Sequence, residues 1–243
     1  MKPNSNSKSQ GEHDDIQVLA FDIFGTVVDW HGSIQSEMAQ LYPGVDGDAF
    51  ALAWRDGYRP AMARVMRGEL PWTLIDDLHR QVLDGILPKF GLSHLDEKQR
   101  AHLNLVWHRL SPWPETVAAL NRLKQKYILC TLSNGNINLL TRMAKRAGLP
   151  WDCILSAEVF QAYKPDPKTY SGVARVFDVS PREVMLVAAH HDDLEGAKAC
   201  GLQTAYVERA HEFGLNRPKD VSPRSANDFH AHDLNDLANQ LGC

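Results

Sequence analysis

The sequence has no apolar run as long as the roughly 18 residues that a membrane-spanning helix requires, so a membrane protein is not expected. It also has no block of like charges: 26 Lys and Arg residues stand against 30 Asp and Glu residues, for a formal net charge of -4. Such a balance provides no electrostatic footprint for a nucleic acid or an anionic membrane surface. A small molecule is therefore the expected partner.

Cysteine is scarce, and its four positions show no CxxC spacing: Cys130, Cys153, Cys200 and Cys243. Most of them lie in apolar or helical surroundings, which is typical of buried, reduced thiols. We therefore expect a reduced, cytoplasmic protein. The polar residues 1–15 lack the apolar middle region of a secretory signal and are expected to form a mobile tail.

Short apolar runs that end in polar or glycine-containing turns recur along the chain and alternate with helix-like segments. These runs are IQVLAFD (16–22), YILCTLSNG (127–135), CILSAEVF (153–160), VMLVAAHHDD (184–193) and LQTAYVE (202–208). The alternation predicts an α/β fold with a mainly parallel sheet covered by helices on both faces. In such sheets the ligand binds beyond the carboxyl ends of the strands.

The pattern changes between Trp30 and Pro112, where apolar residues recur at helical spacing and no comparable strand is found. The expected helices cover residues 33–42, 48–68, 74–91 and 95–110. We therefore expect an α/β core domain built from residues 16–30 and 112–243, with residues 31–111 inserted as a helical cap domain. Apolar positions on the cap helices are compatible with a homodimer.

Four loops place reactive side chains at the same expected edge of the sheet. They contain Asp22, the Ser133–Asn134 pair, Lys164 and the run from His190 to Asp193. Taken alone, each has an ordinary structural explanation as a turn cap, a helix N-cap or a surface lysine. Their coincidence at one edge favours a functional site. A metal site in the last loop is not expected, because consecutive residues on a turn point in divergent directions.

The order of these motifs, DxxGT, a helical cap, Ser-Asn, Lys-Pro and an acidic loop, resembles the haloacid dehalogenase superfamily from Val18 to Leu241. Most of that superfamily are phosphatases with a DxD first motif and further acids that hold magnesium. Here Phe24 and Ala189 stand where two of those acids would be, which leaves fewer of the hard oxygen ligands that magnesium needs. The resemblance therefore implies a metal-free site without a cofactor.

The segments FDIFGTVVDW, AWRDGY, LSNGN, YKPDP and MLVAAHHDDLEGA resemble the type II 2-haloacid dehalogenases more closely. This resemblance implies an α/β core of Rossmann-like topology. It also implies that Asp22 is the nucleophile and that Thr26 forms a hydrogen bond near it. Lys164 would orient Asp22 and keep it ionised, and Asp193 would help to activate the hydrolytic water.

The same resemblance implies a set of substrate-binding residues. Arg55 would receive the departing halide, and Asn134 would help to bind it. The substrate carboxylate would lie against Ser133 and the backbone N–H groups near Ile23 and Phe24.

The fourth motif departs from many relatives, because Ala188 and His190 stand where those relatives have Ser and Asn. Water positioning would then fall to His190, an acid–base residue with an unperturbed pKa of roughly 6.5.

The implied reaction is hydrolysis of a short 2-haloalkanoic acid to the 2-hydroxyalkanoic acid and halide through an aspartyl ester. A halide needs no general acid to leave, and the apolar Phe24 would exclude water from the nucleophile. Two alternatives stay open from the sequence. One is a phosphatase or phosphonate hydrolase acting on a small metabolite, and the other is a non-catalytic binding protein with the same fold.

Overall fold

The computed structural model of the protein describes residues 15–243. The predicted tail, residues 1–15, lies outside this range except for Asp15. The main sheet is built from strands β1, β4, β5, β6, β7 and β8. Their bounds are Val18–Phe21, Ile128–Ser133, Cys153–Ser156, Val184–Ala188, Gln203–Val207 and Phe229–Ala231. All neighbouring strands run parallel in the order β5-β4-β1-β6-β7-β8, which places β1 and β6 at the centre.

The predicted α/β fold class is confirmed. Each of the five predicted runs forms a strand, and the sixth strand, β8, was not predicted because its three residues are too short to show a pattern. Alternate residues of β1 belong to two different cores: Leu19 and Phe21 to one, Val18 and Ala20 to the other. This alternation follows from the two-residue period of a strand, and it requires helices on both faces of the sheet.

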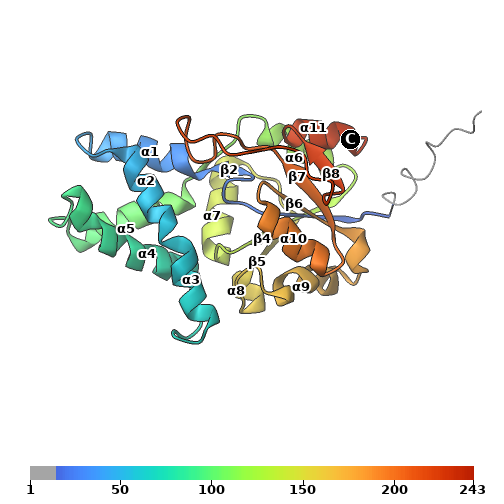
Figure 1. The fold of residues 1–243 in the computed structure, drawn as a ribbon, viewed down its shortest axis with the longest axis horizontal. Coiled ribbons are helices and arrows are strands. Elements are labelled where there is room, and N and C mark those ends of the chain that lie inside the picture. The colour runs from blue at the N-terminus through green and yellow to red at the C-terminus, as the bar shows by residue number, and fades with distance from the viewer. Residues whose placement is uncertain (1–14) are drawn as a thin grey trace, which may run out of the picture.

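Two groups of helices cover the sheet (Figure 1). One face packs against α6 (Thr116–Leu123), α7 (Ile137–Ala147) and α11 (Leu234–Gln240). The other packs against α9 (Pro167–Phe177) and α10 (His191–Ala199), and the short α8 (Ala157–Phe160) follows β5. A 3-10 turn, η3 (Pro181–Glu183), precedes β6.

The segment from Trp30 to His108 contains helices and no strand. These are α1 (Trp30–Leu41), α2 (Gly47–Asp56), α3 (Tyr58–Met66), α4 (Ile75–Ile86), η1 (Leu87–Phe90), α5 (Glu97–Asn104) and η2 (Leu105–His108). A small antiparallel pair, β2 (Val28–Asp29) and β3 (Ser111–Pro112), joins the two ends of the segment. The division into core and cap domains stays a prediction. Every helix within residues 15–243 falls short of the length and apolar character of a membrane span.

The expected helix over 48–68 is divided into α2 and α3 at Gly57. A Cβ at Gly57 would stand 2.3 Å from Cγ1 and 3.2 Å from Cβ of Val82, which lies on α4. The absence of a side chain therefore lets the α2–α3 junction lie directly against α4. This junction carries Arg55 and Tyr58 on either side.

An aromatic cluster joins the helical segment to the loop after β1. The ring of Phe24 lies edge-on to Trp107 at 5.6 Å and to Tyr58 at 6.3 Å between centroids. Trp54 in turn lies edge-on to Trp107 at 5.6 Å, and all of these rings are buried. Edge-to-face contacts of this kind stabilise a packed core beyond the burial of their area. Phe24 is thus part of the packing between the helical segment and the sheet.

The packing at Gly57 has a measurable consequence. We expect Gly57→Ala to lower the free energy of unfolding by about 1–3 kcal/mol, because the new methyl group overpacks the contact with Val82. Urea denaturation followed by circular dichroism measures this change. The matched control is Gly85→Ala in α4, where a Cβ meets no described atom within 4 Å and should be neutral or stabilise by up to about 1 kcal/mol. Equal effects of the two substitutions would show that the contact is not tightly packed.

Candidate active site

Polar and charged side chains gather at the carboxyl edge of the sheet. Asp22 follows β1, Asn134 follows β4, and His190 follows β6 and begins α10. Lys164 comes from the loop between α8 and α9, and Glu212 comes from the loop after β7. The topology therefore brings five separate loops to one place, as expected for a parallel sheet.

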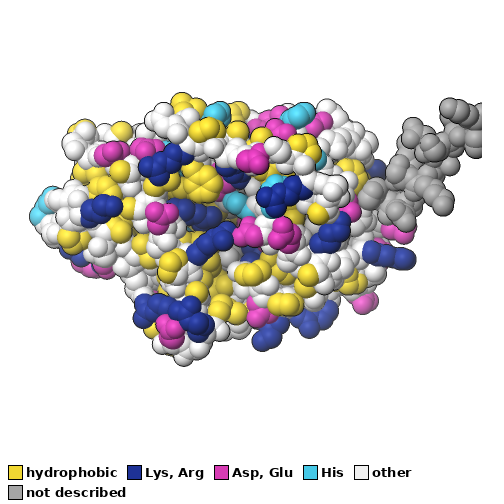
Figure 2. All heavy atoms as spheres, in the orientation of Figure 1, with side chains coloured by type: hydrophobic (Ala, Val, Ile, Leu, Met, Phe, Trp, Pro, Cys, Tyr) yellow, Lys and Arg dark blue, Asp and Glu magenta, His cyan; other side chains and the backbone are white. Residues whose placement is uncertain are grey.

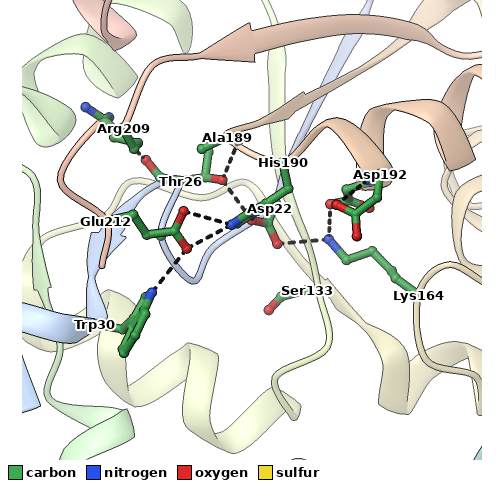
Figure 3. Close-up of polar contacts among 12 residues, drawn as sticks. Asp22, Thr26, Trp30, Ser133, Lys164, Ala189, His190, Asp192, Arg209 and Glu212 are labelled. Atoms are coloured by element: carbon green, nitrogen blue, oxygen red, sulfur yellow. Dashed lines mark hydrogen bonds and ion pairs between the residues drawn. The ribbon is translucent and has the colours of Figure 1, made fainter. Parts of the chain in front are cut away.

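The sharp turn after β1 holds Asp22 in place. The backbone N–H of Asp22 donates to the Val187 carbonyl at 3.0 Å, which extends the pairing of β1 with β6. The Thr26 hydroxyl donates to Oδ2 of Asp22 at 2.7 Å and accepts from the Ala189 N–H at 2.9 Å. Arg209 donates from Nε to the Thr26 carbonyl at 2.9 Å (Figure 3). The carboxylate is thus fixed at its backbone and on one side-chain oxygen.

Lys164 bridges two buried carboxylates. Its Nζ lies 2.9 Å from Oδ1 of Asp22 and 2.5 Å from Oδ2 of Asp193. The Tyr170 hydroxyl donates to the other oxygen of Asp193 at 2.7 Å. Asn134 accepts from the backbone N–H of Lys164 at 2.8 Å, which holds the lysine loop against the loop after β4. The predicted residues Asp22, Lys164 and Asp193 therefore form one hydrogen-bonded group.

The two carboxylates have different acidities. Burial alone would raise the pKa of Asp22, but Lys164 and His190 outweigh it and hold that pKa well below its ordinary value. The pKa of Asp193 is raised, first by burial and also by the negative charge of Asp22, although Lys164 opposes the shift. Burial alone would lower the pKa of Lys164, but the negative charges of Asp193 and Asp22 outweigh burial and hold that pKa above its ordinary value. Asp22 is therefore ionised at neutral pH, and Asp193 is the more basic of the two acids.

A cavity of about 540 Å³ opens above this group. Asp22, Lys164 and Asp193 line it, and much of the remaining lining is apolar. The apolar lining consists of Tyr58, Met62, Ala63, Met66 and Tyr163. Figure 2 shows the same face of the molecule with basic and acidic side chains interspersed, so that neither sign dominates. The apolar lining therefore comes largely from α3, while charged lining residues come both from the loops at the carboxyl edge of the sheet and, as Arg55 and Arg59, from α2 and α3.

Arg55, from the last turn of α2, also lines the cavity. Its guanidinium lies over the ring of Tyr58 at 4.3 Å and near the ring of Trp30 at 5.4 Å. The Nη1 atom is buried and has no hydrogen-bond partner among residues 15–243. An arginine in this state can bind an anion, because its charge is permanent and one of its donors is unused.

The remaining predicted binding residues lie around the cavity at different depths. Asn134 and Phe24 line it, whereas Ile23 and Ser133 are fully buried outside its wall. The Ser133 hydroxyl accepts from the Gly135 N–H at 3.0 Å, so it also stabilises its own loop. Figure 3 shows Ser133 near Asp22 with no direct bond to it. The role of Ser133 and of the Ile23 backbone in binding a carboxylate stays a prediction.

His190 has an unexpected environment. Its Nδ1 lies 3.1 Å from Oδ2 of Asp22, and its Nε2 lies 2.8 and 3.0 Å from the two oxygens of Glu212. Burial lowers the pKa of His190, but Glu212 and Asp22 raise it to about 9. The pKa of His190 in the folded chain therefore lies above the unperturbed histidine value of roughly 6.5, because two buried carboxylates stabilise its charged form.

Glu212, Lys219 and Tyr170 also belong to this group of side chains and were not predicted from the sequence. Glu212 is completely buried, and Lys219 lies 2.6 Å from it. Both follow β7. In a parallel sheet, functional groups lie after the carboxyl ends of the strands, and this rule, applied to β7, would have indicated the loop. Tyr170 had no such signal, because it lies inside α9 with the spacing of an ordinary core residue.

Within residues 15–243, no cluster of three or more His, Cys, Asp or Glu side chains could hold a metal ion. The site is thus a set of hydrogen-bonded acids and bases beside a cavity with an arginine.

Comparison with known proteins identifies relatives of this arrangement. The sequence-family model of the haloacid dehalogenase-like hydrolases matches residues 16–201 of this chain. The (S)-2-haloacid dehalogenase of Xanthobacter autotrophicus is 30% identical over 83% of this chain and 79% of its own length. An L-2-haloacid dehalogenase of known structure superposes with a TM-score of 0.89 at 44% identity, over 93% of this chain and 100% of its own.

A further structure is that of an L-2-haloacid dehalogenase from Xanthobacter autotrophicus with chloropropionic acid covalently bound. It has a TM-score of 0.80 and 26% identity, over 93% of this chain and 98% of that one. The family model covers most of the chain, and the fold matches over nearly its whole length. The chain therefore belongs to the haloacid dehalogenase-like hydrolases, and within them to the type II, or L-2-haloacid, dehalogenases.

Proposed function

We propose that the protein hydrolyses the carbon–halogen bond of short (S)-2-haloalkanoic acids and releases the 2-hydroxyalkanoic acid and a halide. The observation that supports this best is the pairing of one ionised nucleophile, Asp22, with an unpartnered arginine donor, Arg55, on the same cavity. Displacement of a halide needs these two elements, an anionic nucleophile and a cationic receptor for the departing anion.

In the first step, Asp22 attacks the carbon that carries the halogen and forms an ester. Within the described structure, Oδ2 of Asp22 accepts two hydrogen bonds, from Thr26 and His190, whereas Oδ1 accepts one, from Lys164. Oδ1 keeps more free lone-pair density, so we assign it as the attacking atom. Arg55 receives the halide, with Asn134 beside it. Phe24 excludes water, which would otherwise solvate the carboxylate.

In the second step, water attacks Cγ of the Asp22 ester. Asp193 is the base for this water, because its pKa is raised and it is held in place by Lys164 and Tyr170. Ile23 and Ser133 hold the substrate carboxylate in this proposal. The protein works without a cofactor, since each step uses groups of the chain itself.

The cytoplasmic location and the homodimer expected from the sequence also stay predictions. The four cysteines are free thiols, as a reduced protein requires. The exposed apolar side chains Leu41, Met66 and Leu105 lie on helices of the segment predicted as a cap.

The reaction is tested with (S)-2-chloropropionate in a single turnover with excess enzyme in oxygen-18 water. We expect one chloride per substrate and (R)-lactate as the product, because attack from the rear inverts the carbon once. The label should enter the Asp22 carboxylate and not the lactate, since water attacks only the ester.

Two results would contradict the proposal. Labelled lactate in the first turnover would mean that water attacks the substrate carbon directly. Release of phosphate from small phosphate esters, with no chloride from the haloacid, would favour a phosphatase instead.

Replacement of Asp22 and replacement of Asp193 should block different steps of the reaction. We expect Asp22→Asn to form no ester and show no turnover, because an amide is a poor nucleophile. Asp193→Asn should still form the ester but hydrolyse it slowly, so the alkylated protein accumulates. Intact-protein mass spectrometry after mixing with substrate distinguishes the two, with circular dichroism as the control for folding. An Asp193→Asn protein that turns over without accumulating ester would remove the base role.

Arg55 should matter through its charge and its planar shape. Removal of one well-placed electrostatic group lowers kcat by about 10² to 10³-fold in comparable sites, and we expect this range for Arg55→Ala. Arg55→Lys should recover part of the loss, because it keeps the charge without the planar fork. Arg64→Ala, at an exposed position on α3, is the control and should retain activity. A loss of less than about tenfold in Arg55→Ala would place halide binding elsewhere.

A further inference from the structure

His190 lies between two carboxylates and uses both ring nitrogens. Nδ1 faces Oδ2 of Asp22 at 3.1 Å, and Nε2 faces both oxygens of Glu212 at 2.8 and 3.0 Å (Figure 3). A neutral imidazole has one N–H and can donate on one side only. Both contacts are therefore satisfied together only when His190 is an imidazolium. In that state it has no free nitrogen with which to accept a proton from water.

Glu212 is held in place for this contact. Its side chain is completely buried, and it accepts from the Trp30 indole at 3.2 Å and from Lys219 at 2.6 Å. Gly25, in the turn after Asp22, has a φ of +89°, and a Cβ there would stand 2.2 Å from Oε1 of Glu212. The turn that positions the nucleophile is thus also shaped to admit this carboxylate.

His190 and Thr26 contact the same oxygen atom of Asp22. Oδ2 of Asp22 accepts from the Thr26 hydroxyl at 2.7 Å and lies 3.1 Å from Nδ1 of His190. In the proposed reaction Oδ1 becomes the ester oxygen, so Oδ2 becomes the carbonyl oxygen of the ester. Negative charge develops on that carbonyl oxygen when water attacks. Both donors lie at the distance at which an oxyanion hole stabilises such a charge.

We propose that His190, kept as an imidazolium by Glu212, forms with Thr26 an oxyanion hole for hydrolysis of the Asp22 ester. This inference rests on the proposed function and deepens it. His190 contacts the reacting carboxyl and is a catalytic residue, whereas Glu212 acts through His190 and is a positioning residue. The role differs from the water positioning expected from the sequence.

The step balances in atoms and electrons. Asp193 takes a proton from water, and the water oxygen forms a bond to Cγ of Asp22 while the carbonyl electron pair moves onto Oδ2. The pair then returns, the Cγ–Oδ1 bond breaks, and Oδ1 leaves with the substrate carbon. Asp193 gives its proton to the departing alkoxide. The new carboxyl group of Asp22 releases the second proton of the water to solvent.

The charges around His190 explain why Glu212 is needed. The acidic groups that face it are Asp22, Asp192 and Glu212, and the basic groups that line the same pockets as His190 include Arg55, Arg59, Lys164 and Lys219. Formation of the ester removes the charge of Asp22. Burial raises the pKa of Glu212, but His190 and Lys219 lower it to about 2, so Glu212 stays ionised. It is then the principal charge that keeps the proton on His190 during the second step.

The test measures decay of the ester as a function of pH. The enzyme is alkylated by rapid mixing with (S)-2-bromopropionate, and the alkylated protein is followed by quenched-flow mass spectrometry between about pH 6 and pH 10. For the wild-type sequence we expect the rate of ester decay to fall at alkaline pH, because His190 loses its proton there. If His190 were the base instead, the rate would rise with pH in the same range, and that result would overturn the proposal.

Three variants distinguish the role of each group. Glu212→Gln keeps the size and removes the charge, so the alkaline fall should move to lower pH by about one unit or more. Lys219→Met removes a cation next to Glu212, so the fall should move to higher pH, in the opposite direction. His190→Ala should slow ester decay by about 10² to 10³-fold, with no alkaline fall due to this histidine. Shifts in the same direction for Glu212→Gln and Lys219→Met would contradict the electrostatic link.

A matched control exists outside the cavity. Glu208 lies 2.7 Å from Nε2 of His230, which is another histidine–glutamate pair, and Glu208→Gln should leave the pH profile of ester decay unchanged. If Glu212→Gln does not fold, Lys219→Met still gives a signed result. Failure of the proposed function would be seen separately, because no ester would form at any pH. Ester formation with an unchanged profile in both Glu212→Gln and Lys219→Met would overturn the inference alone.

Discussion

The site depends on the contact of Lys164 with Asp22 and Asp193. Removing one partner of a buried ion pair leaves an uncompensated charge and commonly costs about 3–5 kcal/mol, so these three groups depend on one another. Their side chains are each about one-tenth exposed or less. The same lysine contacts two chemically identical carboxyl groups of different acidity: Asp22, the proposed nucleophile, is ionised, and Asp193 is more basic. When the surroundings of two carboxyl groups give them different pKa values, the two groups can take different chemical roles in one site.

The charged groups at the edge of the sheet alternate in sign. They can be buried because each one has a neighbour of opposite charge. Each group lies within 3.1 Å of the next in the order Asp193, Lys164, Asp22, His190, Glu212, Lys219. An ester on Asp22 removes the negative charge near the middle of this series. Lys164 then keeps Asp193 as its partner, and His190 keeps Glu212. In the proposed reaction, Asp193 and Glu212 would thus stabilise the alkylated state in which the second step takes place.

The helical segment contributes a different kind of environment. It provides apolar walls and two cations, Arg55 and Arg59, and the guanidinium of Arg55 lies over the ring of Tyr58. Attraction between a guanidinium and an aromatic face can hold the side chain in place without occupying all of its N–H donors. The close contact of Gly57 with Val82 fixes where this part of the wall lies relative to α4. The proposed halide receptor is therefore held by packing, whereas the proposed nucleophile is held by hydrogen bonds and ion pairs.

The pattern of residues alone predicts the parallel α/β architecture, because strand-length apolar runs that alternate with helices have few other ways to bury both faces of a sheet. It also indicated Asp22, Lys164 and Asp193, since each follows a recognisable strand or turn and the motif order resembles a known family. The protonation state of His190, by contrast, could not be inferred without the folded chain. Its pKa depends on Glu212, which is 22 positions away in the chain, and on a glycine turn that makes room for that carboxylate. Tyr170 was hidden for a similar reason, because a helical core position does not reveal that its hydroxyl reaches Asp193. Local patterns report which strand end a residue follows, but the acidity of a buried group is set by charges that folding brings together from distant parts of the chain.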